Sequence, residues 1–329
     1  MKTNRTKVFL VIPTIRDLSF LKSWKNEFKN CHLIVVEDRE KSQVIISKKN
    51  FLSVSYFTWK DIDRDLGKDS WIISRHNAGI RSYGFLKAYE MGADTIITID
   101  DDCYPTKDAF VKGHISNLDF KVPDSWIPTY PNMNWIYTRG FPYSNRDKYP
   151  VMISHGLWSG ALDLDAKTET KLPRLLREKI YPPIRQIIPF NYFYPMCSMN
   201  LAFKREITPL MFFPMMGQKP DGSNWPYNRY DDIWAGLFSK KIMDHLGFAV
   251  INGSPFIEHR KASKLKDNYQ KELEGMKINE VLWKMVGEVK LTKNTPKTCY
   301  IELAKKIKFP KGKYFKKIRE AMIIWANLF

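Results

Sequence analysis

Short apolar runs alternate with helix-like stretches over the first 105 residues of the chain. The runs at 8–12, 33–36 and 95–99 are rich in β-branched residues and have the lengths of strands buried on both faces. Between them, the sequence predicts helices over about 18–28 and 77–91. This strand–helix–strand rhythm is typical of an α/β fold, in which a mostly parallel sheet is flanked by helices.

The middle of the chain, residues 120–230, has little clean periodicity. It is rich in proline, aromatic residues and methionine, which is typical of irregular loops that wall a pocket. Within it, glycines and prolines in the polar stretch 211–230 predict a mobile lid. Helical spacing returns over 231–246, a short strand is expected at 249–251, and a basic helical segment then extends to about Val286.

The chain beyond Val286 is basic and amphipathic. Residues 287–329 contain ten lysines and one arginine against three glutamates, a net charge of +8. Apolar side chains recur there at helical spacing, namely Phe315, Ile318, Met322, Trp325 and Phe329. Such a helix could pack on the body of the protein, form an oligomer contact or lie on an anionic membrane.

Composition narrows the class of protein. A chain of 329 residues with 44% hydrophobic content suits one large globular domain or two small ones. No apolar run reaches the roughly 18 residues of a membrane span, and residues 1–7 are too polar for a secretory signal, so we expect a cytoplasmic protein. The cysteines lack C-x-x-C spacing, which argues against a zinc site and a disulfide framework.

The formal charge of +18 predicts an anionic partner. Nucleic acid, an acidic lipid surface and a phosphorylated small molecule all fit such a charge. Nearly half of the excess lies in the tail, and the sequence contains no recognised nucleic-acid-binding module, so nucleic acid is the weakest of the three.

Three carboxylates, Asp100, Asp101 and Asp102, directly follow the predicted strand at 95–99. Ligands of open α/β sheets collect at such carboxyl ends. In an extended chain Asp100 and Asp102 share a face, and their mutual repulsion would be relieved by a divalent cation that also binds phosphate and water. An Asp-x-Asp alone is more often a solvated turn. The chain has neither G-x-G-x-x-G nor a P-loop, so metal is the natural means of holding phosphate, and no flavin is expected.

Two further groups of side chains could carry chemistry. Asp231 and Asp232 open the predicted helix at 231–246, where they could complement the helix dipole, bind sugar hydroxyls or act as a general base. His259 and His155 are most simply structural histidines.

Several blocks of the sequence resemble the plant reversibly glycosylated polypeptides, also called UDP-arabinopyranose mutases. The blocks are Ile-Asp-Asp-Asp-Cys at 99–103, Arg-Gly-Phe-Pro-Tyr-Ser at 139–144, Ser-His-Gly-Leu-Trp at 154–158, Pro-Met-Cys-Ser-Met-Asn-Leu-Ala-Phe at 195–203, Arg-Tyr-Asp-Asp-Ile-Trp-Ala-Gly at 229–236, Asp-His-Leu-Gly at 244–247, and His259 followed by Lys-Ala-Ser at 261–263. They occur in order and extend the resemblance over roughly residues 8–285. The basic tail lies outside them.

The resemblance implies a GT-A type, Rossmann-like fold and a nucleoside-diphosphate-sugar substrate, with a UDP-sugar first and CDP- or dTDP-sugars as alternatives. By position it implies that the base and ribose are bound near 13–14 and Asp38, and the diphosphate near Arg81. The nucleotide-binding residues expected are Pro13, Thr14, Asp38, Arg81, Asp100 and Asp101. The expected ligands of Mn²⁺ or Mg²⁺ are Asp100, Asp102 and His259, because GT-A proteins often complete the metal shell with a late histidine.

Arg146 occupies the position, nine residues before His155, at which plant members become glycosylated. A guanidinium does not readily lose its proton, so holding the diphosphate while charge develops is its more natural task. Both roles stay open. The resemblance makes the expected catalytic residues Arg146, Asp231, Asp232 and His155.

The function implied is a metal-dependent, flavin-independent mutase that interconverts pyranose and furanose forms of a nucleotide sugar for cell-surface polysaccharide. A self- or acceptor-glycosylating glycosyltransferase is the alternative, and a non-catalytic sugar-nucleotide-binding scaffold is a third. We expect a catalytic domain over 1–286 and a basic amphipathic extension over 287–329. That extension is expected to pack on the body, form a homo-oligomer or contact the inner face of the membrane peripherally.

Overall fold

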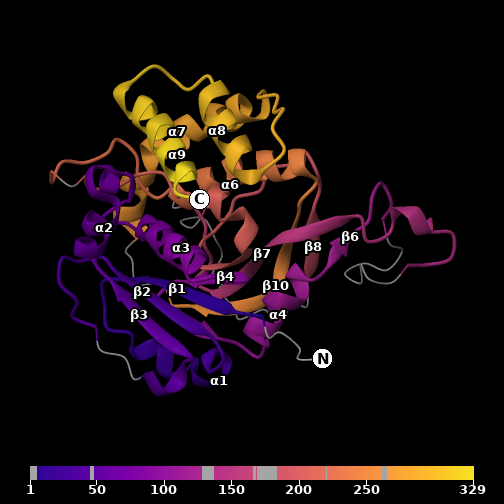
Figure 1. Cartoon of the computed structure of the whole chain (residues 1–329), viewed down its shortest axis with the longest axis horizontal. Coiled ribbons are helices and arrows are strands. Elements are labelled where there is room, and N and C mark those ends of the chain that lie inside the picture. The colour runs from indigo at the N-terminus through magenta and orange to yellow at the C-terminus, as the bar shows by residue number, and fades with distance from the viewer. Residues whose placement is uncertain are drawn as a thin grey trace.

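The computed structural model describes residues 6–44, 48–127, 137–165, 168, 184–219, 221–260 and 265–329. Within these residues ten strands form one sheet, whose main path has the order β3-β2-β1-β4-β9-β7-β10-β5 (Figure 1). The strands on this path are β3 Ser53–Phe57, β2 His32–Glu37, β1 Val8–Thr14, β4 Thr95–Ile99, β9 Asn200–Lys204, β7 Tyr149–Gly160, β10 Ala249–His259 and β5 Cys103–Pro105. Off the path, β6 Lys121–Val122 pairs with β7, and β8 Arg185–Ile188 pairs with β10.

The N-terminal half of the sheet is parallel. Strands β3, β2, β1 and β4 run in one direction, so the carboxyl ends of β1, β2 and β4 meet at one edge. Strand β9 is antiparallel to both β4 and β7, and β7 and β10 are again parallel. The strands expected at 8–12, 33–36 and 95–99 are all present, and the predicted α/β fold with a mostly parallel sheet is confirmed.

Helices cover both faces of the sheet. In Figure 1, α3 and the C-terminal helices lie above the sheet, and α1 and α4 lie below it. The helices are α1 Lys25–Phe28, α2 Trp59–Leu66, α3 Arg81–Glu90, α4 Phe110–Leu118, α6 Asp231–Leu246, α7 Leu265–Gly287, α8 Pro296–Lys306 and α9 Lys313–Asn327. The predicted helix at 18–28 is split into a 3-10 turn at Ser19–Lys22 and α1.

Helix α3 packs closely on β1 and β2 because it carries Gly84 at the contact. A Cβ added at Gly84 would come within 2.4 Å of a methyl carbon of Val11 and 2.9 Å of one of Val36. Any larger residue would therefore push the helix off the sheet. Helix α6 begins and ends where predicted, and Gly247 closes it in the left-handed conformation, with φ of 71°.

The expectation of irregular loops throughout 120–230 is wrong, because β7 and β9 are central strands of the sheet. Each carries a fully buried polar side chain that is hydrogen-bonded to His114 of α4, so the apolar pattern of a core strand is interrupted. His114 contacts the hydroxyl of Ser154 at 2.8 Å through Nδ1 and the amide oxygen of Asn200 at 2.9 Å through Nε2. In these strands, hydrogen bonds between buried polar side chains take the place of the alternating apolar side chains that usually mark a core strand.

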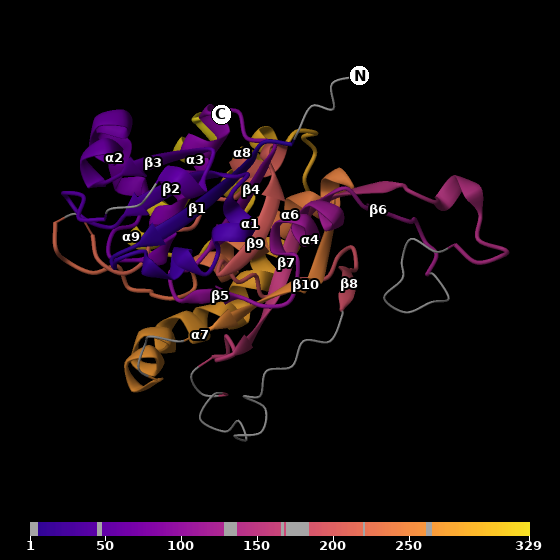
Figure 2. The ribbon, with the colours of Figure 1, turned by 90° about the horizontal axis from the view of Figure 1, so that it is seen from below.

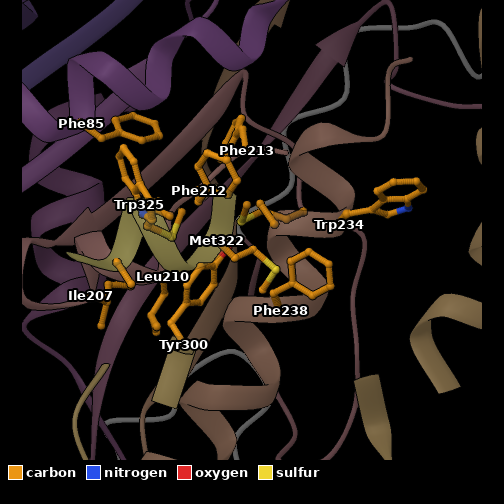
Figure 3. Close-up of a cluster of buried hydrophobic side chains, with 14 of the residues drawn as sticks. Phe85, Ile207, Leu210, Phe212, Phe213, Trp234, Phe238, Tyr300, Met322 and Trp325 are labelled. Atoms are coloured by element: carbon orange, nitrogen blue, oxygen red, sulfur yellow. The ribbon is translucent and has the colours of Figure 1, made fainter. Parts of the chain in front are cut away.

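The first part of the expected lid is also core. Residues Met211, Phe212, Phe213, Met215 and Met216 are completely buried. Phe212 packs on Trp325 and Phe213 on Phe85, so 211–216 cannot act as a lid (Figure 3). Beyond them, Gln218 forms isolated antiparallel β-bridges with Arg75 and with Asn224. Pro220 lies outside the described residues.

The basic tail packs on the body of the protein through its apolar stripe. Met322 and Trp325 of α9 and Tyr300 of α8 enter the same hydrophobic cluster as Leu210 and Phe238 (Figure 3). Trp325 also donates its indole N–H to the carbonyl of Pro209 at 3.1 Å. The tail contains two helices rather than one, because the connection at 307–312 includes Pro310. No helix in the described part of the chain combines the length and apolar character needed to cross a membrane.

Glu302 fastens the connection between α7 and α8. Its carboxylate accepts hydrogen bonds from the Thr292 N–H at 2.8 Å, the Thr292 hydroxyl at 2.7 Å and the Lys293 N–H at 3.0 Å. Lys306 adds an ion pair at 2.6 Å. Burial alone would raise the pKa of Glu302, but these four donors outweigh it and lower the pKa to about 2.

We predict that Glu302→Gln lowers the free energy of unfolding at pH 7 by about 2 kcal/mol, since a charged acceptor of four donors is lost. A carboxyl with a lowered pKa stabilises the fold above its ordinary value of 4.5, and this contribution is lost as the pH falls towards 2. Urea denaturation of wild type and variant should therefore show a deficit that narrows below pH 4.5. Glu320→Gln, at a half-exposed pair with Lys317, is the control and should cost little. An equal deficit in both variants would contradict the prediction.

Candidate functional site

A cavity of about 790 Å³ opens where the parallel strands β1 and β4 end. Its described lining comes from loops after these strands, from the start of α6, and from two segments further along the chain. The lining residues lie at 13–16, 76–78, 80–81, 100–102, 162–165, 195–199 and 228–233, with Asp38, Trp158, His259, Lys271 and Glu272. The topology thus brings together residues that are distant in sequence at the edge where ligands of open α/β sheets bind.

Most of the side chains expected from sequence line this cavity. They are Pro13, Thr14, Asp38, Arg81, Asp100, Asp101, Asp102, Asp231, Asp232 and His259. Their functional roles stay predictions, but their convergence is a property of the fold. Arg146 and His155 are not among the described lining residues.

Arg81 is the buried centre of the site. Its side chain is completely shielded from solvent and makes four hydrogen bonds within the described residues. The acceptors are the Ala78 carbonyl at 3.0 Å, the Thr98 hydroxyl at 2.9 Å, the Ser198 carbonyl at 2.8 Å and the Asp100 carboxylate. Since a guanidinium has five N–H donors, Arg81 has little left for a ligand. Its evident task is to fix Asp100 and the 195–199 segment.

The three consecutive carboxylates have different principal partners. The chain turns at 100–103, where the Cys103 N–H donates to the Asp100 carbonyl at 3.3 Å, so extended-chain alternation ends at Ile99. Asp100 is bound to Arg81, whereas Asp101 accepts hydrogen bonds from Thr14 at 2.7 Å and Arg16 at 2.6 Å. Asp100 and Asp102 nevertheless both line the cavity, with Arg81 and His259 as their respective neighbours.

Asp102 has His259 as its neighbour. Strand β10 pairs antiparallel with β5 in a register that places His259 opposite Cys103. The imidazole Nδ1 donates to the Ala161 carbonyl at 2.7 Å, which leaves Nε2 facing Asp102 Oδ1 at 3.7 Å. Burial lowers the pKa of His259, but Asp102 raises it more, so the net shift is upwards.

A divalent cation fits this edge of the cavity with few protein ligands. No cluster of three His, Cys, Asp or Glu side chains in the described ranges is arranged to hold a metal ion, although Asp100, Asp102 and His259 all line the cavity. Asp102 and His259 Nε2 do offer an oxygen and a nitrogen donor side by side. One or two protein ligands are typical where phosphate and water complete the shell of Mg²⁺.

Asp231 and Asp232 begin α6 and line the same cavity. Asp232 accepts hydrogen bonds from both the N–H and the hydroxyl of Ser198, each at 3.0 Å. Burial raises the pKa of both carboxyls, and the charge of Asp231 adds to the rise at Asp232, to about 7. Near neutral pH the pair therefore carries fewer than two negative charges.

His155 is a structural residue, not a group at the cavity. Its Nε2 accepts the Cys197 N–H at 2.9 Å, and its Nδ1 donates to the side-chain oxygen of Asn252 at 2.7 Å. Both ring nitrogens are thus occupied, and burial lowers its pKa. It holds the 195–199 segment through the hydrogen bond from Cys197, and it has no free nitrogen for proton transfer.

Arg146 lies in the segment before β7, which extends away from the body beyond β6 (Figure 2). Its guanidinium donates to the Phe141 carbonyl at 3.0 Å and stacks over the ring of Tyr143, 4.0 Å from the centroid. Within a single copy of the chain, the structure does not bring Arg146 to the cavity. The expectation that it holds the diphosphate there rested on its position in the family motif and on the chemistry of a guanidinium, neither of which reveals that this segment projects outwards.

Several lining residues escaped the sequence reasoning. Arg16 lies only two positions after Thr14 and could have been found by extending that loop. Asp163 and Asp165 form a second Asp-x-Asp after β7, which a search for strand-terminal carboxylates would have detected if β7 had been recognised. Glu272 reaches the cavity from α7 and binds Arg229 at 2.9 Å, a contact that no local pattern reveals.

Comparison with known proteins places these features in context. A family model described as reversibly glycosylated polypeptide matches residues 3–329, a span that includes the basic tail. The chain is 38% identical to probable UDP-arabinopyranose mutase 1 of Pisum sativum, over 97% of this chain and 89% of that protein. It is 37% identical to UDP-arabinopyranose mutase 1 of Arabidopsis thaliana, over 97% of this chain and 90% of that protein.

Among solved structures, the chain is similar to glucosyl-3-phosphoglycerate synthase from Mycobacterium tuberculosis. The complex of that enzyme with Mn²⁺ and UDP-glucose shares 12% identity and a TM-score of 0.45, over 84% of this chain and 79% of that one. Its complex with Mg²⁺ and UDP shares 11% identity and a TM-score of 0.43 over the same fractions.

We predict that Arg81→Lys lowers the free energy of unfolding by about 3 kcal/mol, because an ammonium cannot reach acceptors on three segments at once. Urea denaturation followed by circular dichroism measures the loss. The control is Arg64→Lys on α2, where an arginine with 65% side-chain exposure pairs with Asp61 and Asp65 and a change within about 0.5 kcal/mol is expected. Similar stabilities for the two variants would contradict the central role of Arg81.

Proposed function

Because the chain belongs to the reversibly glycosylated polypeptide family, we propose that it is a nucleotide-sugar mutase. In this proposal it interconverts the pyranose and furanose forms of a UDP-sugar. The observation that carries the proposal is the similarity, over 97% of the chain, to relatives named UDP-arabinopyranose mutase. The cavity supports it through its charge and through the carboxylates that line it.

The charge of the cavity suits a diphosphate bound together with a metal. Nine carboxylates but only four arginine and lysine side chains occur among its described lining residues, in a protein whose net charge is +18. A nucleoside diphosphate would be repelled by this lining unless a cation accompanied it. We propose that Asp102 and His259 hold Mn²⁺ or Mg²⁺, which when bound supplies the positive charge that neutralises the diphosphate as it leaves.

The nucleoside end lies where β1 and β2 finish. Thr14 is paired in register with Glu37, so Pro13, Thr14 and Asp38 lie together at this wall. Asp38 is held rigidly, because its carboxylate accepts the indole N–H of Trp59 at 2.7 Å and the backbone N–H of Asn77 at 3.0 Å. A fixed carboxylate with lone pairs to spare can accept a hydrogen bond from a base or a ribose hydroxyl.

The sugar end is assigned to Asp231 and Asp232. Interconversion of ring forms requires the bond between the anomeric carbon and the diphosphate to break, a different hydroxyl to become the ring oxygen, and the phosphate bond to form again. The protonated carboxyl gives its proton to the ring oxygen as the ring opens. The ionised carboxyl takes the proton of the hydroxyl that closes the new ring. No net proton is gained, and Ser198 holds Asp232 in place throughout.

A pair that shares one proton predicts a bell-shaped dependence of turnover on pH. Since the pKa of Asp232 is raised to about 7, turnover should fall at higher pH as the acid is lost, and fall again once both carboxyls are protonated. Asp232→Asn should reduce kcat about 100-fold or more and abolish the alkaline limb. Asp221→Asn, which alters a solvent-exposed turn, is the control. A flat profile between pH 5.5 and 8, or an active Asp232→Asn, would argue against this assignment.

The reaction itself can be tested with purified protein, Mn²⁺ and UDP-arabinopyranose, without acceptor or flavin. We expect reversible formation of the furanose, with the less strained six-membered ring dominant at equilibrium. An ¹⁸O label in the oxygen that bridges sugar and phosphate should scramble into the non-bridging positions, because the anomeric bond breaks. If no furanose forms and no label scrambles with uridine, cytidine or thymidine sugars, the mutase proposal fails and the glycosyltransferase alternative replaces it.

A further inference from the structure

Arg16 projects into the cavity from the loop after β1, beside the carboxylates that follow β4. Its Nη1 lies 2.6 Å from Asp101 Oδ1 and 3.8 Å from Asp102 Oδ2. The partner carboxylate is itself held, because the Thr14 hydroxyl donates to Asp101 Oδ2 at 2.7 Å. Thr14 in turn accepts the backbone N–H of Arg16 at 3.0 Å, so loop, carboxylate and guanidinium form one closed unit.

Three arginines occur among the described lining residues of the cavity, and they differ in what they can still bind. Arg81 is completely buried and donates four hydrogen bonds to the protein. Arg229 is tied through Nε to Glu272 at 2.9 Å. The side chain of Arg16 is 45% exposed, and within the described ranges only its Nη1 donates to the protein. Its Nη2 and Nε can therefore bind two oxygens of one anion in the planar geometry that phosphate favours.

We infer that Arg16 binds the diphosphate of the nucleotide sugar and that Asp101 positions it for this contact. The inference rests on the proposed function, in which Asp102 carries the metal and the diphosphate lies against it. The guanidinium is already within 4 Å of Asp102, so phosphate oxygens at that carboxylate lie within its reach. Asp101, being negative, cannot bind phosphate itself and acts through Arg16. This assignment takes the place of the diphosphate contacts expected of Arg81 and Arg146.

The pair of Arg16 and Asp101 suits a binding role better than a structural one. An ion pair whose arginine side chain is 45% exposed contributes little to folding. Removal of Arg16 should therefore leave the fold intact while it removes a charge-assisted contact to phosphate. This separation makes the inference testable by binding alone, without any measurement of turnover.

Calorimetry with UDP, uridine and inorganic pyrophosphate, each with Mn²⁺, provides the test. We expect Arg16→Ala to weaken UDP and pyrophosphate binding about 10- to 100-fold, the worth of a hydrogen-bonded charge pair, and to leave uridine binding unchanged. Arg16→Lys, which keeps the charge but loses the planar fork, should lie between wild type and Arg16→Ala. Arg64→Ala is the matched control, because Arg64 is also an exposed arginine paired with aspartates but lies on α2 outside the cavity lining.

A double-mutant cycle tests the part played by Asp101. Asp101→Asn should weaken UDP binding less than Arg16→Ala, and the double variant should bind UDP no more weakly than Arg16→Ala alone. The affinity for Mn²⁺ in the absence of nucleotide, measured by electron paramagnetic resonance, should be the same in Asp101→Asn and wild type. Additive losses, or a weakened Mn²⁺ affinity in Asp101→Asn, would overturn the positioning role.

The outcomes separate this inference from the mutase proposal. If wild type binds UDP and Arg16→Ala binds it equally well, the inference fails whatever the reaction is. If Arg16→Ala loses UDP but wild type forms no furanose, the role of Arg16 stands and the mutase proposal fails. If wild type binds neither UDP nor pyrophosphate with Mn²⁺, both fail together.

Discussion

The geometry of the cavity depends on one buried guanidinium. Arg81 bonds to Ala78 before α3, to Thr98 and Asp100 at the end of β4, and to Ser198 before β9. A charge without solvent is tolerated only if its partners stay in place, so each of these segments is fixed relative to the others. Through Ser198 the constraint extends to Asp232, which accepts both hydrogen bonds of that residue. One arginine thus fixes the position of Asp100 relative to that of Asp232.

The topology of the sheet explains why these segments can meet at all. Strand β9 inserts antiparallel beside β4, so the 195–199 segment that precedes it arrives at the end where β4 finishes. Strand β5 turns back from the same point and pairs with β10, which carries His259 to Asp102. Parallel strands alone would have collected loops from one half of the chain. The antiparallel pairs add residues from the other half to the same edge.

Sequence reasoning succeeded where burial leaves a simple pattern. The strand at 8–12 is an uninterrupted apolar run and the strand at 95–99 is entirely β-branched, because both faces of each are covered, and α6 has a clear start at Asp231 and a stop at Gly247. The same logic missed β7 and β9, because Ser154 and Asn200 are buried by mutual hydrogen bonding with His114, not by apolar character. Spacing along the chain also failed at Arg146, whose segment leaves the body. Ten expected site residues line the cavity, because most of the motifs follow strands whose ends converge.

The docking of α9 has a consequence for how the protein forms during synthesis. Met322 and Trp325 complete a cluster that includes Phe85 and Phe212, yet the ribosome adds α9 only after every strand of the sheet. Domains usually begin to fold from the N-terminal side as the chain emerges. Here the strongly apolar segment 207–216 stays exposed to solvent until α9 has left the exit tunnel. A nascent chain stalled before α9 would therefore expose an aggregation-prone apolar surface. We expect such a chain to be bound by chaperones that recognise exposed hydrophobic segments.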